Sequence, residues 1–338
     1  MSRLLKKLAS LRLTLVGMIT LAVLAVVGSR NPDIGTGVTI WPIALLVFNL
    51  LAALLSNKVF RTQTGLLVFH VGMLLVFACI GLTVLTGYEG RVELVQGGAF
   101  DASQVTTMKQ GSWHDHRLDD LEFFQKDVRV NYLPNFIRLD TNSTIQYRTA
   151  AGEVREATTG DQRTVNINGY EIAATFNKGF AVLLHWTAED GREALGSVHF
   201  PSYPSFDWKQ VTTWTTPAGQ TVELELELEE PVADIRHSWT LGRTDLPFEV
   251  QIGRSGNAVA TARNGESVAL EGGTVRVEGL RMWMAYRISY LPYLSWLFVA
   301  AMLAIVGLAM HFGRRYVLPA DSPMKPRVME ADVHVARV

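Results

Sequence analysis

The side chain with the clearest chemical potential is a histidine inside a long apolar stretch. The segment from Gly65 to Gly90, GLLVFHVGMLLVFACIGLTVLTGYEG, is apolar enough to cross a bilayer, and His70 lies near its start. An ionisable side chain inside a membrane helix is uncommon and usually functional. The imidazole could ligate a metal or a haem iron, relay protons, or bond to a neighbouring helix. The alternative is an interfacial histidine that bonds only to a backbone carbonyl or a lipid headgroup.

Three further residues of the apolar segments carry functional groups. His311 ends the last apolar segment and could be a second axial ligand or a nearby partner of His70. Because Arg314 and Arg315 follow it, an interfacial anchor is the stronger interpretation. Asn49 is predicted to form a hydrogen bond between helices, and Cys79 to be a small core residue.

The remaining histidines lie outside the apolar segments. WHDHR (Trp113–Arg117) places His114 and His116 two residues apart, where a strand would put both on one face. No further ligands with metal spacing are apparent, so a solvated loop is favoured over a metal site. A structural role is predicted for the three that lie beside aromatic residues, namely His185, His199 and His237.

Sequence motifs exclude several enzyme classes. No P-loop, GxSxG, HExxH or dinucleotide fingerprint occurs. The one cysteine cannot form an internal disulfide, and without CxxC or CxxCH the chain itself has neither dithiol chemistry nor covalent haem attachment. The formal net charge of -1 gives no indication of a nucleic-acid partner.

Membrane segments must position His70. The chain has 338 residues, of which 48% are hydrophobic, and its mean hydropathy is +0.16. A bilayer-spanning helix needs roughly 20 apolar residues. Four windows meet this requirement without a charged residue: Leu13–Ser29, Val38–Asn57, Leu66–Gly87 and Ile288–Phe312.

Positive charges predict the orientation of these helices. Lysine and arginine gather before the first helix, between the second and third, and after the fourth, whereas the loop RNPDIGTG carries only Arg30. Both termini are therefore predicted to be cytoplasmic. The third helix would then enter from the cytoplasmic side near Leu66, which puts His70 one turn, about 6 Å, deeper.

The long segment between the third and fourth helices reads as β-rich. TVELELELEE (Thr221–Glu230) alternates apolar and charged residues, as a strand with one buried face does. Asn168-Gly169 is a hairpin dipeptide, and Asp190-Gly191 and Asn264-Gly265 are similar breaks. We therefore expect an α+β membrane protein in which four transmembrane helices flank an extracytoplasmic β sandwich or barrel-like domain.

The expected division of the chain follows from these patterns. It runs as a basic N-terminus (1–12), three helices (13–87), the extracytoplasmic domain (88–287), the fourth helix (288–312) and a disordered cytoplasmic tail (313–338).

Three regions give the chain a family resemblance. They are SLRLTLVGMITLAVLAVVGS (Ser10–Ser29), WPIALLVFNLLAALLSNKVFR (Trp41–Arg61) and LLVFHVGMLLVFACIGLTVLTGYEGRVELVQGG (Leu66–Gly98). They resemble the helices of the ResB family of cytochrome c biogenesis proteins, including the family's exit from the third helix into a first strand. The order of helices, β domain, closing helix and basic tail is also similar.

The resemblance implies a haem-handling role. A histidine in the family's third helix is implicated in binding haem within the membrane, which assigns that role to His70. His311 is the candidate second ligand from its position alone. The implied cofactor is a non-covalent haem b. The implied partners are a polytopic haem-handling subunit of the CcsA/ResC type, apocytochrome c and a thioredoxin-like thiol reductant, in a bacterial cytoplasmic membrane.

We therefore expect an accessory subunit of c-type cytochrome maturation in system II. It would help to hold and pass haem and to position apocytochrome, without being an enzyme by itself. Two alternatives stay open at this point: a b-type haem subunit of a quinol-linked electron-transfer complex, and a membrane-anchored scaffold without a cofactor.

Overall fold

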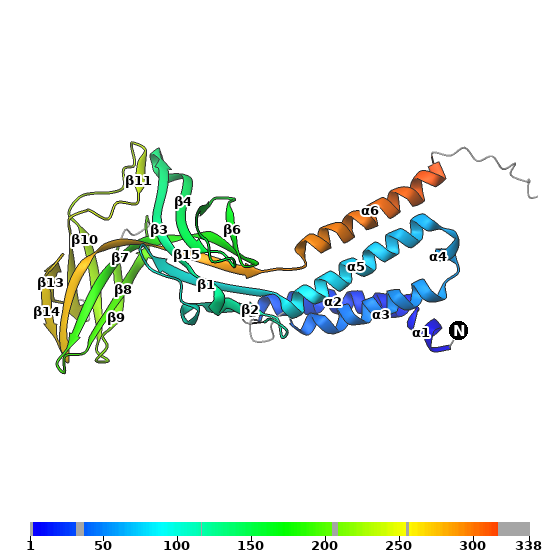
Figure 1. Ribbon diagram of the computed structural model, residues 1–338, viewed down its shortest axis with the longest axis horizontal. Coiled ribbons are helices and arrows are strands. Elements are labelled where there is room, and N and C mark those ends of the chain that lie inside the picture. The colour runs from blue at the N-terminus through cyan, green and yellow to red at the C-terminus, as the bar shows by residue number, and fades with distance from the viewer. Residues whose placement is uncertain (1–2, 32–36, 116, 205–208, 255–256, 317–338) are drawn as a thin grey trace, which may run out of the picture. The chain divides into compact units, whose positions relative to one another are not determined.

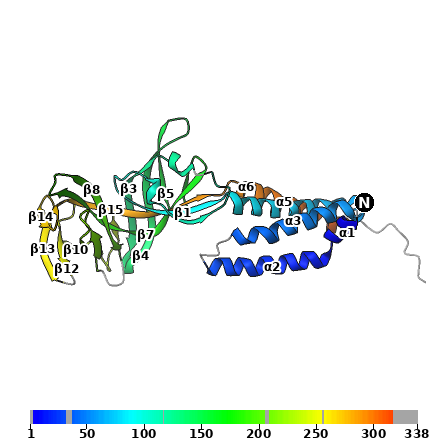
Figure 2. The same ribbon diagram turned by 90° about the horizontal axis from the view of Figure 1, so that it is seen from below.

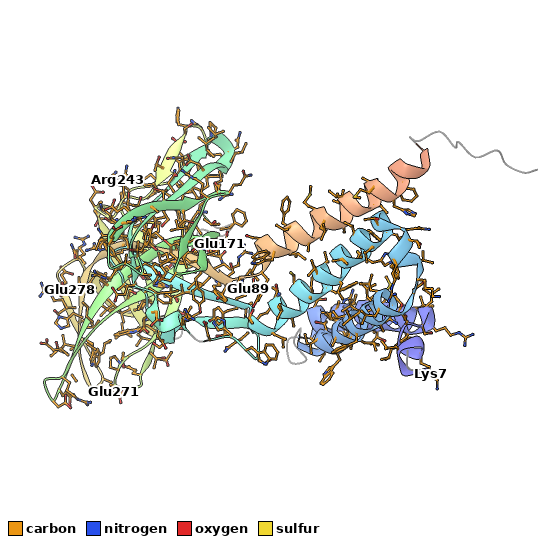
Figure 3. All side chains as sticks on the ribbon, turned by 45° about the vertical axis from the view of Figure 1, so that its right-hand side comes forward. Lys7, Glu89, Glu171, Arg243, Glu271 and Glu278 are labelled. Carbon is orange, nitrogen blue, oxygen red and sulfur yellow. The ribbon has the colours of Figure 1, made fainter. Side chains whose placement is uncertain are left out.

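The chain folds as two compact units. The computed structural model describes residues 3–31, 37–115, 117–204, 209–254 and 257–316 (Figure 1). The first unit gathers helices from both ends of the chain, and the second unit consists mainly of Leu82–Pro292. In Figure 3 the charged residues labelled Arg243, Glu271 and Glu278 belong to the strands and loops of the second unit, whereas the long helices carry mainly carbon side chains.

The first unit is helical. Its helices are α1 (Arg3–Leu8), α2 (Leu11–Arg30), α3 (Ile40–Ser56), α4 (Val59–Thr62), α5 (Thr64–Thr86) and α6 (Leu294–Tyr316), with a 3-10 turn at Gly37–Thr39. The last five residues of α5 are grouped with the second unit.

Four of these helices are long and apolar enough to cross a membrane, as predicted. The spans are Leu11–Arg30, Gly37–Ser56, Thr64–Thr86 and Leu294–Gly313. The chain is therefore a multi-pass membrane protein by length and composition.

The predicted start of the fourth helix is wrong. Ile288 lies in a strand and is fully buried, and α6 begins only at Leu294. An apolar run in a buried strand cannot be distinguished from a helix by hydropathy alone, and here the two are consecutive. The predicted tail lies almost wholly outside the described residues.

Small residues bring α5 and α6 into backbone contact. A Cβ added at Gly72 would lie 2.5 Å from the backbone nitrogen of Ala304, and one at Gly307 would lie 2.2 Å from that of Phe69. Close approach through small residues is a common way to pack membrane helices, because the hydrophobic effect does not drive association in lipid.

Asn49 joins α3 to α1 and α2, which confirms the predicted hydrogen bond between helices. The buried amide donates to the carbonyls of Leu8 and Ser10 and accepts from the Thr14 hydroxyl at 2.7 Å. One side chain therefore satisfies a carbonyl at the end of α1 and another just before α2.

The second unit is built from antiparallel strands (Figure 2). The strands are β1 (Tyr88–Val95), β2 (Thr106–Gln110), β3 (Phe123–Leu133), β4 (Ile137–Arg148), β5 (Val154–Gly160), β6 (Thr164–Ile167), β7 (Tyr170–Ala188), β8 (Glu193–Ser202), β9 (Val211–Thr215), β10 (Thr221–Leu228), β11 (Trp239–Leu241), β12 (Phe248–Arg254), β13 (Asn257–Arg263), β14 (Ser267–Leu270) and β15 (Gly273–Tyr290).

Three sheets enclose one apolar core. The largest has the order β2-β1-β15-β7-β6, with β14 on β15 and β8 on β7; the others run β13-β12-β10-β9 and β11-β3-β4-β5. Buried residues from all three sheets form a single cluster. The α+β class and the β-rich domain of antiparallel sheets are confirmed.

Local sequence signals of the β domain are confirmed. Asn168 and Gly169 both have positive φ, at 52° and 89°, in the tight turn between β6 and β7. Gly191 and Gly265 also have positive φ in turns. In β10 Val222, Leu224 and Leu226 are buried, so the glutamates that alternate with them occupy its outer face.

A short loop closes the end of α5. The backbone amide of Trp113 donates to the carbonyl of Leu85 at 2.7 Å, and His114 Nδ1 donates to that of Thr86 at 3.0 Å. The amide of Gly111 bonds to the carbonyl of Gly87, just after the helix. The last carbonyls of a helix have no partner within it, so this loop supplies partners for two of them.

We predict that Gly72→Ala destabilises the protein although alanine is the better helix former. The added methyl group must displace backbone atoms of α6, and overpacking costs about 1–3 kcal/mol. The thermal unfolding midpoint in detergent measures the effect. Gly313→Ala is the matched control, because its Cβ would meet nothing within 4 Å. Equal midpoints for the two variants would contradict the close contact of α5 with α6.

Candidate functional site

His70 lies in the first half of α5, and one contact fixes the tautomer of its neutral ring. Its Nδ1 is 2.8 Å from the carbonyl oxygen of Leu66, one helical turn earlier. Because a carbonyl only accepts, Nδ1 carries the proton in this bond. Nε2 of the neutral ring then keeps its lone pair for another partner.

Aromatic side chains hold the half-buried imidazole in place. The ring centroid of Phe60, from the short helix α4, is 4.7 Å from that of His70, and the Phe69 ring packs edge-on at 5.0 Å. No hydrogen bond to Nε2 occurs among the described residues. The sequence alone did not identify these two rings as neighbours of His70.

The imidazole is on the side of α5 away from α6. Gly81, which has nearly the same direction as His70 at 3.6 residues per turn, approaches α3 so closely that an added Cβ would lie 3.1 Å from the Ile43 side chain. Gly72, which approaches α6, points about 160° away from His70.

These contacts fit an axial ligand of a haem iron. Metal-ligating histidines usually donate their other ring N–H to a carbonyl or carboxylate, as His70 does to Leu66. Within the described residues no group of three histidine, cysteine or acidic side chains could hold a bare metal ion. A porphyrin needs only one or two protein ligands, so its iron is the metal that this single donor suits.

His311 has a different environment. Its ring packs on Phe312 at 5.3 Å, and its backbone nitrogen would lie 2.5 Å from a Cβ at Gly65. This contact leaves no space for a flat macrocycle between α5 and α6 at that level. The geometry therefore gives no support to a haem held between His70 and His311, and the second-ligand role of His311 stays a prediction. Cys79 is buried, as expected of a small core residue.

The expectation of a solvated WHDHR loop is wrong for His114, which is only 5% exposed. Its Nε2 lies 2.9 Å from the Tyr170 hydroxyl, and its ring stacks on Tyr88. Because Nδ1 donates to Thr86, Nε2 accepts the proton of Tyr170. Burial raises the pKa of Tyr170 far above its usual value, which keeps the hydroxyl protonated. His116 lies outside the described residues.

A second histidine of the β domain also has specific side-chain partners that the sequence did not indicate. His199 stacks on Trp283, with ring planes 4° apart, and its Nδ1 is 3.2 Å from Glu93. The hydrogen bond with His199 is the largest cause that lowers the pKa of Glu93. The partners come from three different strands, so spacing along the chain could not have found them. By contrast, His237 is exposed and bonds to Asp234, and His185 lies near Glu193 and Glu278.

Lys178 is a buried cation that the sequence did not reveal. It is 5% exposed, donates to the Phe176 carbonyl and lies 5.8 Å over the ring of Tyr132. Burial, with a smaller contribution from Arg138, lowers the pKa of Lys178 to about 8.

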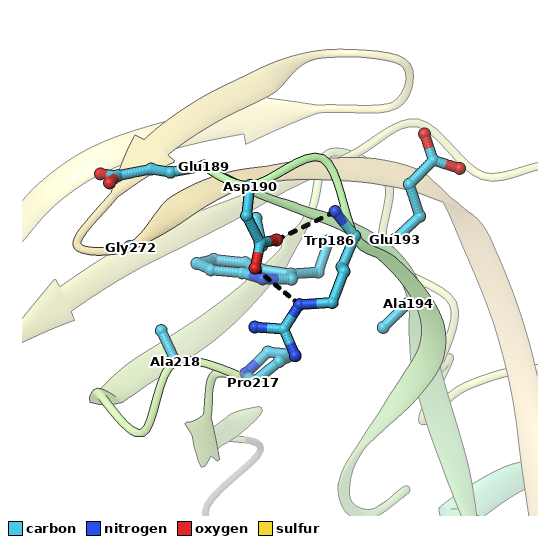
Figure 4. A pocket seen from close by; sticks show the side chains of 10 residues that line it. Trp186, Glu189, Asp190, Glu193, Ala194, Pro217, Ala218 and Gly272 are labelled. Carbon is cyan, nitrogen blue, oxygen red and sulfur yellow. Dashed lines mark hydrogen bonds and ion pairs between the residues drawn. The ribbon is translucent and has the colours of Figure 1, made fainter.

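A cavity of about 440 Å³ opens between three hairpin turns of the β domain (Figure 4). The indole of Trp186 lies among its lining residues, and Arg192 is bonded to Asp190 at 2.7 Å. Because this ion pair is largely exposed, it contributes little energy and defines no ligand.

We predict that Lys178→Met stabilises the protein at pH 7. A folded pKa near 8, below the usual 10.5, means that the unfolded chain binds more protons between these values, so stability rises with pH there. The variant should gain at most about 3 kcal/mol at pH 7, and its advantage should vanish by pH 10.5. Thermal unfolding against pH measures this, with exposed Lys109→Met as the control for a lost charge. If the difference in stability between Lys178→Met and the unchanged protein does not vary with pH, burial does not lower the pKa of Lys178 as described.

Comparison with known proteins supports the family resemblance. A family model described as the ResB-like family matches residues 51–169, about a third of the chain. The matched segment runs from the end of α3 through His70 and α5 to the turn between β6 and β7. No curated protein sequence matches the chain.

Proposed function

We propose that this chain is an accessory membrane subunit of c-type cytochrome maturation, with His70 as a haem ligand within the membrane. The ResB-like match suggests a role in cytochrome c biogenesis, and the four apolar helices support a multi-pass membrane protein. The observation that carries the proposal is the hydrogen bond from His70 Nδ1 to the Leu66 carbonyl. This bond leaves the lone pair of Nε2 available to bind a haem iron.

His70 acts by holding one nitrogen in a fixed direction. The bond to Leu66 fixes the tautomer, while Phe60 and Phe69 restrict rotation of the ring. Haem, when bound there, would supply the iron porphyrin to be attached to apocytochrome. The chain's own contribution would be to bind and orient this group, which lowers the entropy cost of the later attachment.

The partners and the sidedness belong to the same proposal. Lysine and arginine flanks would place both termini in the cytoplasm and the β domain on the periplasmic side of a bacterial inner membrane. A CcsA/ResC-like subunit would share the haem, and a thioredoxin-like reductant would keep the apocytochrome thiols reduced. With Cys79 buried in a membrane helix, this chain would supply orientation and not thiol chemistry.

The electron-transfer alternative receives no comparable support. It needs two histidines facing one porphyrin, and the backbone contact between Gly65 and His311 closes the space between their helices. Redox titration with quinol would identify such a subunit directly.

We predict that the His70→Ala variant, expressed with its partner subunit, co-purifies with less haem, measured by absorbance. The yield of mature cytochrome c should fall at least tenfold. Truncation of the side chain removes Nε2 without adding bulk. Added imidazole should restore part of the absorbance, because it can replace the missing ring.

His237→Ala is the control, since this histidine is exposed and bonds only to Asp234 among the described residues. It should leave both readouts unchanged. If His70→Ala keeps the same haem spectrum and still matures cytochrome c, the ligand assignment is wrong.

A further inference from the structure

One loop of the β domain, residues 111–115 after β2, lies beside the last turn of a membrane helix. The amide of Gly111 donates to the carbonyl of Gly87, and the amide of Trp113 donates to that of Leu85. Residues 82–86 of α5 are grouped with the β domain, so these contacts lie within one compact unit. The main chain at Trp113 is therefore level with Leu85, inside the apolar span of α5 and not beyond its end.

A glycine allows the loop to approach the helix this closely. A Cβ added at Gly111 would lie 2.2 Å from the carbonyl oxygen of Leu85 and 2.7 Å from that of Val84. Both oxygens belong to the helix backbone, which cannot move aside as a flexible side chain can. A larger residue at this position would therefore push the loop away from α5.

Hydrogen bonds within the protein occupy the polar groups of this loop that lie against α5. Such bonding is required at membrane depth, where water is not available as a partner. His114 is buried, its amide donates to the carbonyl of Gly111, and its Nδ1 donates to that of Thr86. The side chain of Trp113, by contrast, is 63% exposed. The loop thus turns its polar groups toward the protein and this indole outward.

An exposed indole at this level suits the interface between lipid and water. Tryptophan is enriched there because its ring is apolar and its N–H can bond to headgroups. Two other exposed tryptophans, Trp41 and Trp296, lie at the starts of α3 and α6. With one crossing per apolar helix, these starts and the end of α5 lie on the same side of the bilayer. Trp113 would add the β domain to this belt of aromatic residues.

The charges beside the loop are balanced. Asp115 bonds to Arg117 at 2.8 Å, and Lys109 of β2 lies 3.5 Å from Glu89 of β1. All four side chains are partly exposed, so they can remain in the headgroup layer. Because each of these cations already has a carboxylate, the pairs supply no excess positive charge that would select anionic lipids.

We propose that the loop around Trp113 anchors the β domain to the membrane surface, with the indole among the headgroups of zwitterionic phospholipids. This inference goes beyond the proposed function and does not depend on a haem ligand. The anchor would also fix the depth of His70, because Leu85 lies about 22 Å further along the same helix.

The test is tryptophan fluorescence of the purified full chain in phosphatidylcholine nanodiscs whose acyl chains carry bromine, a contact quencher. The emission of Trp113→Phe is subtracted from that of the unchanged protein, so the difference reports Trp113. This difference should lose most of its intensity with bromine near the headgroups and little with bromine at the chain ends. A difference that neither lipid quenches would overturn the anchor, since Trp113 would then face water or a partner protein.

Trp214→Phe is the matched control. This tryptophan of β9 packs against the main core and the ring of Trp186, so its difference should not respond to bromine at either position. Circular dichroism verifies that each variant is folded.

Gly111→Ala tests the same contact without removing the indole. The added methyl group must move the loop off α5, so the quenched fraction of the Trp113 emission should fall. Gly196→Ala is its control, because a Cβ there would meet nothing within 4 Å. Equal quenching in these two variants would refute the role of the close contact with Leu85.

Nanodiscs that contain phosphatidylglycerol test the lipid class. Quenching of Trp113 should be the same in them, because the indole and not a free cation meets the headgroups. Quenching that requires the anionic lipid would overturn the assignment to zwitterionic headgroups.

Discussion

The structure depends on one constraint: a polar group in hydrocarbon must find its hydrogen-bond partner inside the protein. Asn49 meets this constraint by bonding to two carbonyls and one hydroxyl of neighbouring elements. His70 meets it with one nitrogen and leaves the other available. At the far end of the same helix, Trp113 and His114 bond to its last carbonyls. The same rule therefore stabilises the bundle, orients the candidate ligand and ties α5 to the β domain.

His70 and His199 differ in the contacts that fix their orientation. A main-chain carbonyl orients His70, whose aromatic neighbours lie on its own helix and on α4. A carboxylate orients His199, which rests on an indole from another strand. A carboxylate makes an imidazole a more basic ligand than a neutral carbonyl does.

Much of this fold could be predicted because its signals are local. Uninterrupted apolar windows identify membrane helices, and Asn168-Gly169 encodes its own turn. The start of α6 was misplaced because Ile288 is apolar for a different reason, burial in a strand. The environments of His114, Lys178 and His199 could not be predicted, since each depends on strands that are distant along the chain. His70 was recognisable because hydrocarbon makes any ionisable residue conspicuous.

The pairing of β1 with β15 has a consequence for biogenesis. Tyr88, directly after α5, is the register partner of Tyr290, four residues before α6. The strand that occupies the middle of the largest sheet is thus the last one to leave the ribosome. The edges of β1 and β7 that pair with β15 stay unpaired until β15 is synthesised. Such non-local pairing slows folding. These unpaired edges therefore need protection until synthesis nears its end.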